Sequence, residues 1–229
     1  MIVAEQKPLS EIIELVGGAR RLLIAGCGAC VTICFAGGRK EVGVLASQMR
    51  IAAAKAGNGI VIEEETVERQ CEDEFVAPLK EKIEAADVVV SLACGVGAQT
   101  LVEMFPDKII APGLNTTFYG RPKTPGFFAE YCAGCGDCVL GLTGGICPVS
   151  RCSKHMLNGP CGGSEAGRCE VDPENIECAW QLIYDRLKRL GRLEMLEKIA
   201  LAKDWRTGGH NGPRRMTREE MLPLDTGGK

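Results

Sequence analysis

The sequence is poor in the residues that acid–base enzymes and nucleic-acid-binding proteins use most. It has only two histidines and 5% aromatic residues, and no Ser/His/Asp arrangement indicates nucleophilic hydrolysis. The formal net charge of −3 gives no long-range attraction for phosphate backbones. No apolar run approaches the roughly 18 residues of a membrane span. These absences argue against a hydrolase, a nucleic-acid-binding protein and a membrane-spanning protein.

Nothing at the N-terminus is typical of a secretory signal. The chain opens Met1-Ile-Val-Ala-Glu-Gln-Lys7, without a basic n-region or a long apolar h-region. We therefore expect a cytoplasmic location, where closely spaced cysteines are more often metal ligands or catalytic groups than disulfides. The odd total of 13 cysteines also disfavours a disulfide framework.

The densest feature of the sequence is a run of cysteines between residues 132 and 178. Its members are Cys132, Cys135, Cys138, Cys147, Cys152, Cys161, Cys169 and Cys178. A C-x2-C-x2-C motif with a later Cys-Pro pair is the spacing by which bacterial ferredoxins hold [4Fe–4S] clusters. The short Gly-rich intervals fit, because glycine reaches the positive φ values that wrapping a cluster requires. Eight thiolates are enough for two cubane clusters.

Structural zinc is the main alternative for this segment, because four-cysteine zinc sites also use C-x2-C pairs. The third cysteine of the motif and the Cys147-Pro148 pair favour iron–sulfur clusters. In ferredoxins the Cys-Pro thiolate ligates the other cluster. That rule assigns Cys132, Cys135 and Cys138 with Cys178 to one cubane, and Cys147, Cys152, Cys161 and Cys169 to the second.

The N-terminal half alternates predicted strands with predicted helices. Short apolar strands are expected at 21–25, 59–62, 87–92 and 108–111, and helices at 9–18, 41–56, 75–86 and directly after residue 97. Residues 63–74 are expected to be an acidic turn. Strands alternating with helices predict βαβ units. The expected fold class is α/β, with a doubly wound, Rossmann-like parallel sheet.

Five further cysteines follow the predicted strands. Cys27, Cys30 and Cys34 come after the first strand, Cys71 lies beyond the second, and Cys94 follows the third. Loops after parallel strands meet at the carboxyl edge of the sheet, where ligands bind. Cys27, Cys30, Cys71 and Cys94 would complete a third cubane, and Cys34, one helical turn beyond Cys30, could substitute. The alternative is that these are buried core cysteines.

Two glycine loops resemble dinucleotide-binding loops without completing the motif. Gly26-x-Gly28 and Gly95-x-Gly97 follow strands, but neither continues as G-x-G-x-x-G. We expect no nucleotide or flavin site in this chain, no catalytic residue, and no cofactor-binding residues beyond the metal ligands.

The predicted domain organisation has four parts. Residues 1–118 form the α/β domain, 119–130 a linker with two prolines and two glycines, and 131–178 the Cys-rich, ferredoxin-like module. Residues 174–229 form a C-terminal helix, expected from about 174 to 204, and a tail. The tail has too little apolar content to fold alone.

Several motifs carry a resemblance to a known family. The C-x2-C-x2-C run, Cys147-Pro-Val-Ser-Arg-Cys152 and Asn158-Gly-Pro-Cys161-Gly-Gly163 resemble the methylenetetrahydrofolate reductase C-terminal family, the small iron–sulfur subunit of the acetogen-type reductase. Gly26-Cys27-Gly28 and Glu68-Arg-Gln-Cys71 also resemble it, so the likeness spans about residues 20–180.

The resemblance implies a non-catalytic, electron-transfer role inside a larger complex. The implied partner is a flavin-containing (β/α)8-barrel subunit that reduces 5,10-methylenetetrahydrofolate to 5-methyltetrahydrofolate, supplied through an upstream redox protein or complex. The implied cofactors are [4Fe–4S] clusters, two in the C-terminal module and a third in the N-terminal domain, with zinc able to replace one. The alternative function is a zinc-stabilised scaffold or assembly subunit of the same or another one-carbon enzyme complex.

Overall fold

The computed structural model describes residues 1–208, 213–216 and 218. The chain divides into two compact units, one from Met1 to Tyr131 and the other from Cys132 onward. We describe each unit by itself. No helix in the described ranges is long and apolar enough to cross a membrane.

The first unit is built on a parallel sheet of four strands in the order β3-β2-β4-β5. The strands are β2 (Arg21–Cys27), β3 (Val61–Val67), β4 (Val88–Leu92) and β5 (Ile109–Pro112). The two central strands are apolar and buried almost throughout, as strands covered on both faces must be. The predicted α/β class and parallel sheet are confirmed.

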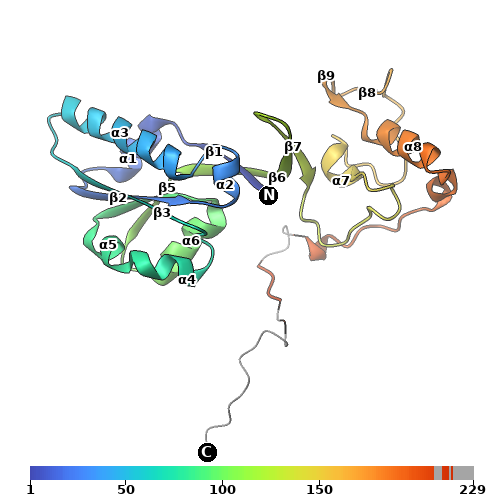
Figure 1. Ribbon diagram of the computed structural model, residues 1–229. Coiled ribbons are helices and arrows are strands. Elements are labelled where there is room, and N and C mark those ends of the chain that lie inside the picture. Colours follow the sequence, from blue (N-terminus) through green and yellow to red (C-terminus); the bar gives the residue numbers. More distant parts are fainter. Residues whose placement is uncertain (209–212, 217, 219–229) are drawn as a thin grey trace, which may run out of the picture. The chain divides into compact units, whose positions relative to one another are not determined.

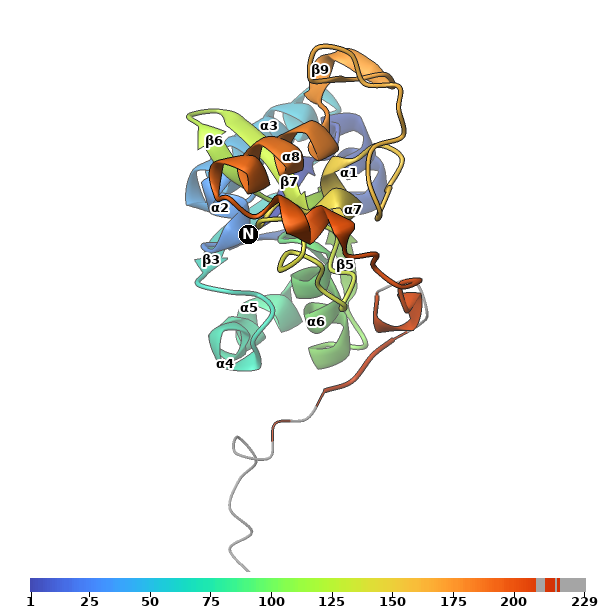
Figure 2. The ribbon, with the colours of Figure 1, turned by 90° about the vertical axis from the view of Figure 1, so that its right-hand side faces the viewer.

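Helices cover both faces of this sheet. Helices α1 (Leu9–Val16) and α3 (Arg39–Lys55) lie on one face, and α4 (Asp73–Val76), the 3-10 turn η1 (Ala77–Leu79), α5 (Lys80–Ala85) and α6 (Gly95–Met104) lie on the other (Figures 1 and 2). Because side chains alternate along a strand, Ile24 packs with Leu45 on the first face. Leu23 packs with Ile83 and Leu101 on the second.

A second sheet of three strands adjoins the first, in the order β1-β6-β7. It consists of β1 (Ile2–Gln6), which the sequence did not predict, β6 (Leu114–Thr124) and β7 (Phe127–Cys132). The predicted linker at 119–130 is therefore a β-hairpin, and Gly126 at φ 79° lies in its turn. Pro122 is tolerated on the β1 side because β1 pairs with β6 only as far as Tyr119.

The predicted acidic turn is also a strand in its first part. Residues 63–65 lie in β3, at the edge of the parallel sheet. Their carboxylates pair with basic side chains on neighbouring elements: Glu63 with Arg21, Glu64 with Arg50 and Glu65 with Lys82. Charged side chains on an edge strand disfavour pairing with another chain, so this run has a structural use.

The second unit has little regular structure and a small core. It contains α7 (Pro148–Arg151), the antiparallel pair β8 (Arg168–Cys169) and β9 (Asp172–Glu177), α8 (Ala179–Arg189), and the 3-10 turns η2 (Leu193–Glu197) and η3 (Trp205–Thr207). Trp180, Ile183, Leu187 and Met195 form the core with Cys178.

The predicted helix over 174–204 is confirmed only for residues 179–189. Residues 172–177 form β9, and α8 begins only at Ala179 and ends at Arg189. The Asp172 carboxylate accepts a hydrogen bond from the Asn175 backbone N–H at 3.0 Å, a local turn that competes with helix. Gly191 at φ 65° then stops the chain from continuing as a helix.

Candidate metal centre

Two cysteines lie at the carboxyl edge of the parallel sheet. After β2 the chain forms β3 on one side of β2 and then crosses to β4 on the other, so the carboxyl ends of β2 and β4 meet at a switch point where ligands bind in such sheets. Cys27 is the last residue of β2. Cys94 lies two residues beyond β4 and is the N-cap of α6.

A buried glutamine brings the loop after β3 to the same place. Gln70 is 0% exposed. Its Nε2 donates to the Ala25 carbonyl of β2 at 2.8 Å, and its Oε1 accepts from the Ser91 hydroxyl of β4 at 2.7 Å. Because both ends of the amide are bound to central strands, the next residue, Cys71, is held at the carboxyl edge. Sequence reasoning missed Gln70, although its place directly before a candidate ligand was the available signal.

The three thiols interact electrostatically. Partial burial raises the pKa of the Cys71 thiol, and Cys27 and Cys94 raise that pKa further. Cys71 is an exposed residue overall. Cys27 Sγ lies 3.9 Å from the Glu68 carbonyl in the same loop. Three of the five predicted N-terminal cysteines thus lie on segments that end at the same edge of the sheet.

Glycines permit this close approach. A Cβ at Gly97 would lie 2.8 Å from the Ala93 Cβ and 2.9 Å from the Gln70 Cβ. Only a glycine therefore lets the first turn of α6 pack against the loop that carries Cys71. The Gly95-x-Gly97 pair that resembles a nucleotide loop has a packing role here.

The remaining two N-terminal cysteines are placed differently. Cys34 follows α2 (Cys30–Ile33), and its Sγ lies 3.5 Å from the Val31 carbonyl and 3.6 Å from the Ala4 carbonyl of β1. It packs against the hydrophobic core. Cys30 is half-buried at the start of α2. Of the two, Cys34 is the one directed into the fold.

In the second unit, helix α7 is flanked by two cysteines. Cys147 is its N-cap and Cys152 its C-cap. Between them, the Ser150 hydroxyl is buried with no hydrogen-bond partner, which is costly unless a further group accepts from it. Cys152 also packs on the core cluster that contains Cys178, the N-cap of α8.

Cys161 and Cys169 lie beside a charged pair. The Cys161 thiol donates to Glu170 Oε1 at 3.0 Å, and Lys154 pairs with the same oxygen. The Ser153 hydroxyl lies 3.5 Å from Cys169 Sγ, and this hydrogen bond lowers the pKa of the Cys169 thiol. The pKa of Glu170 is lowered, chiefly by the hydrogen bond from Lys154.

The C-x2-C-x2-C loop is covered by a later segment of the chain. Gly134 and Gly136 have φ values of 62° and 78°, as wrapping the motif requires. The Thr207 hydroxyl donates to the Cys135 carbonyl at 2.9 Å. A Cβ at Gly136 would lie 2.0 Å from the Thr207 carbonyl oxygen, so the backbone of the cysteine loop packs directly against the backbone at Thr207.

All 13 cysteines are free thiols. In the described ranges no three His, Cys, Asp or Glu side chains are gathered closely enough to hold a metal ion as they stand. Cys27, Cys71 and Cys94 therefore do not form a coordination shell as they stand. In the second unit the thiols of Cys147 and Cys152 flank the unpaired Ser150 hydroxyl, and such a donor set fits a thiolate-ligated metal group. The assignment of individual cysteines to clusters stays a prediction.

The C-terminal part of the chain matches one known family. Residues 111–206 match the family described as methylene-tetrahydrofolate reductase C terminal. Over this segment the chain is similar to that family. The matched segment begins in β5 and includes all eight clustered cysteines, whereas Cys27, Cys71 and Cys94 lie outside the match. Comparisons with curated proteins and with solved structures give no match.

Proposed function

We propose that this chain is the iron–sulfur, electron-transfer subunit of a methylenetetrahydrofolate reductase complex. It passes electrons to a flavin-containing (β/α)8-barrel subunit that reduces 5,10-methylenetetrahydrofolate to 5-methyltetrahydrofolate. The observation that supports the proposal is that the segments carrying Cys27, Cys71 and Cys94 all end at the carboxyl edge of the parallel sheet, in a chain whose residues 111–206 match the reductase C-terminal family.

The residues that would hold the clusters are the cysteines of both units. In the first unit they are Cys27, Cys71 and Cys94, with Cys30 as the fourth. In the second unit the eight thiols of the ferredoxin-like module would hold two more. Bound iron–sulfur clusters supply one-electron transfer. The protein's own contribution is to orient the thiols through Gln70 and to keep the loops close through Gly97.

The need for a flavoprotein follows from the chemistry of the substrate. Reducing a methylene group to methyl takes two electrons, and iron–sulfur clusters deliver one at a time, so a two-electron carrier has to stand between them. In this chain cysteines occupy the glycine loops after the strands, and neither loop completes a phosphate-binding motif. The partner should therefore hold the flavin.

Metal analysis of anaerobically purified protein tests the proposal. Three cubanes would give about 12 iron atoms per chain and a brown colour. About 8 iron atoms with one zinc would support the electron-transfer role with one site exchanged. A colourless protein that contains only zinc would overturn the proposal in favour of a zinc-stabilised scaffold.

A reconstitution experiment tests the division of labour. The chain is mixed with methylenetetrahydrofolate and a low-potential electron donor, with and without the flavoprotein subunit. We expect methyl product only when both proteins are present. Product formation by this chain alone, free of flavin, would contradict the proposal.

A further inference from the structure

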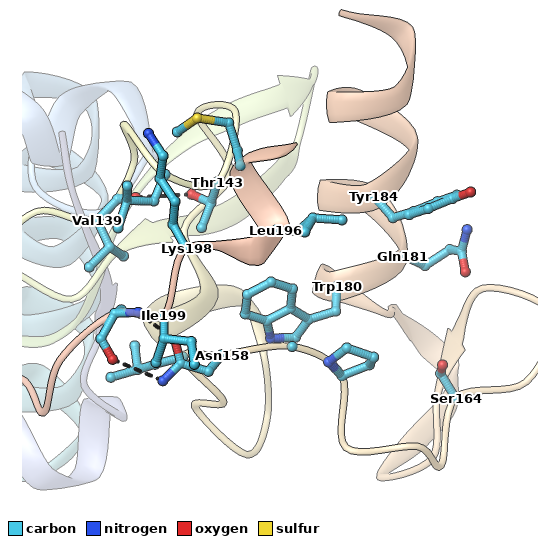
Figure 3. A pocket seen from close by; sticks show the side chains of 16 residues that line it. Val139, Thr143, Asn158, Ser164, Trp180, Gln181, Tyr184, Leu196, Lys198 and Ile199 are labelled. Atoms are coloured by element: carbon cyan, nitrogen blue, oxygen red, sulfur yellow. Dashed lines mark hydrogen bonds between the residues drawn. The ribbon is translucent and has the colours of Figure 1, made fainter. Parts of the chain in front are cut away.

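The second unit contains a cavity that none of the cysteines lines. Its volume is about 450 Å³, and it lies between α8, the loop at 157–160 and the segment at 195–200 (Figure 3). The Trp180 indole forms the inner wall, with Leu196 and Ile199 across from it. A largely apolar cavity of this size with a few polar groups is typical of a binding site.

Hydrogen bonds fix the walls of the cavity in place. The indole N–H of Trp180 donates to the Met156 carbonyl at 2.8 Å. Asn158 makes two bonds to Ala200: its Nδ2 donates to the carbonyl at 3.0 Å, and its Oδ1 accepts from the backbone N–H at 2.7 Å. The loop at 157–160 and the segment after η2 are thus joined directly, so the cavity is preformed.

Large apolar side chains are exposed around its rim. Ile199 is 79% exposed, and Leu201, next to the lining residue Ala200, is 87% exposed. Tyr184 and Leu196, both lining residues, are 40% and 39% exposed. Single exposed apolar residues are ordinary, but several around one cavity mark an interaction site.

The charged side chains placed at the cavity are positive. Lys198 lines it, and Lys188 Nζ lies 5.8 Å from the centre of the Tyr184 ring. Among the described residues neither lysine pairs with a carboxylate, whereas Arg192 pairs with Glu194. The charged residues of this stretch are Asp185, Arg186, Lys188, Arg189, Arg192, Glu194, Glu197 and Lys198. Basic residues outnumber acidic ones in this stretch, and the two lysines placed at the cavity, Lys198 and Lys188, favour an anionic partner.

We propose that this cavity docks an acidic, amphipathic segment of the flavoprotein partner. Apolar side chains of that segment would enter against Trp180, and its carboxylates would meet Lys198 and Lys188, in the manner of a helix laid into a groove. The inference rests on the proposed function, because that function names the partner, and it adds the surface of this chain that the partner contacts.

The test measures binding of the flavoprotein subunit to the full-length chain carrying Ile199→Asp. Because Ile199 is exposed in the free chain, the substitution should leave the fold intact. The substitution removes an aliphatic side chain that the proposed complex would bury, and it places a charge in an apolar interface. The Kd of the complex with the flavoprotein subunit should therefore rise by about tenfold or more. Leu201→Asp tests the same surface independently, by the same Kd measurement.

Val171→Asp is the matched control. Val171 is 56% exposed, belongs to the same unit and does not line the cavity, so the Kd of the Val171→Asp variant should match that of the unsubstituted chain.

Lys198→Glu tests the charge of the rim, since reversing a rim charge mainly slows association and reduces the dependence of association on salt.

The outcomes separate this inference from the proposed function. If the unsubstituted chain binds the flavoprotein and Ile199→Asp and Leu201→Asp bind equally well, the docking surface is wrong while the function stands. If these variants change self-association in sedimentation and not flavoprotein binding, the face pairs two copies of this chain and the inference is overturned. If the unsubstituted, iron-loaded chain does not bind the flavoprotein, both fail.

Discussion

The Lys203 ammonium is buried against the backbone carbonyl of Asp137. The lysine side chain is 1% exposed, its Nζ donates to that carbonyl, and the Asp137 carboxylate lies 3.6 Å away. The Cys135 thiol is directed at the same carbonyl, at 3.7 Å. A cation from the segment after η2 is thus fixed beside the middle cysteine of the C-x2-C-x2-C motif.

We predict that Lys203→Met destabilises the second unit, because it removes the charged donor that the buried lysine offers to the Asp137 carbonyl, while keeping an aliphatic stem. A lost hydrogen bond to a charged group typically costs about 1.5–3 kcal/mol. Urea unfolding monitored by Trp fluorescence measures the change. Lys188→Met, at an exposed lysine, is the control, and equal stability of the two variants would contradict the assigned role.

A pair of glycine variants tests whether close packing of α6 against the Cys71 loop is needed for stability and for metal binding. Gly97→Ala should cost about 1–3 kcal/mol by overpacking, because its Cβ would clash with Ala93 and Gln70, and it should lower the iron content by displacing the Cys71 loop. Gly95→Ala, in the same helical turn, would meet only the Thr116 hydroxyl at 3.7 Å. We expect it to keep both stability and iron, and equal effects of the two would refute the packing argument.

A pair of cysteine variants tests which thiols belong to that site. Cys94→Ser should remove about four iron atoms, one cubane, and leave the C-terminal clusters in place. Cys34→Ser should keep its iron, because its thiol is directed at the Ala4 and Val31 carbonyls. Iron analysis with electron paramagnetic resonance reports both. Unchanged iron in Cys94→Ser would count against a third cluster.

The stability of the first unit should depend on pH through Asp87. Its carboxylate accepts hydrogen bonds from the backbone N–H groups of Arg20 and Arg21, both at 2.9 Å, and these lower the pKa of Asp87. A group with a lowered folded-state pKa stabilises above its unfolded pKa, about 4 for Asp, and loses this contribution as the pH falls through the folded value. Asp87→Asn should therefore lower Tm most at neutral pH.

The check is a series of melting curves for both proteins between neutral and acidic pH. The Tm difference between the unsubstituted protein and Asp87→Asn should shrink below about pH 4. A difference that stays constant across that range would show that the charge of Asp87 does not contribute.

The sequence by itself determined the features that depend on local pattern. Apolar runs such as 21–25 and 87–92 are buried parallel strands, because a strand covered on both faces needs apolar residues at every position. The similarity of residues 111–206 to the reductase C-terminal family was readable from the cysteine spacing, since the intervals within one short motif are a local feature of the sequence. The grouping of cysteines at strand ends followed from the common direction of parallel strands.

Tertiary structure alone decided the features that depend on residues far apart in the chain. The first part of β6, residues 114–119, pairs with β1 at the other end of the first unit, a contact that no local pattern shows. The thiol of Cys34 turns toward β1, whereas Cys71 is carried to Cys27 and Cys94 by hydrogen bonds of Gln70 to two central strands. The burial of Lys203 at Asp137 likewise joins residues 66 apart. Spacing along the chain limits which residues can be neighbours. Only the packing of the folded chain determines which of these residues actually are neighbours.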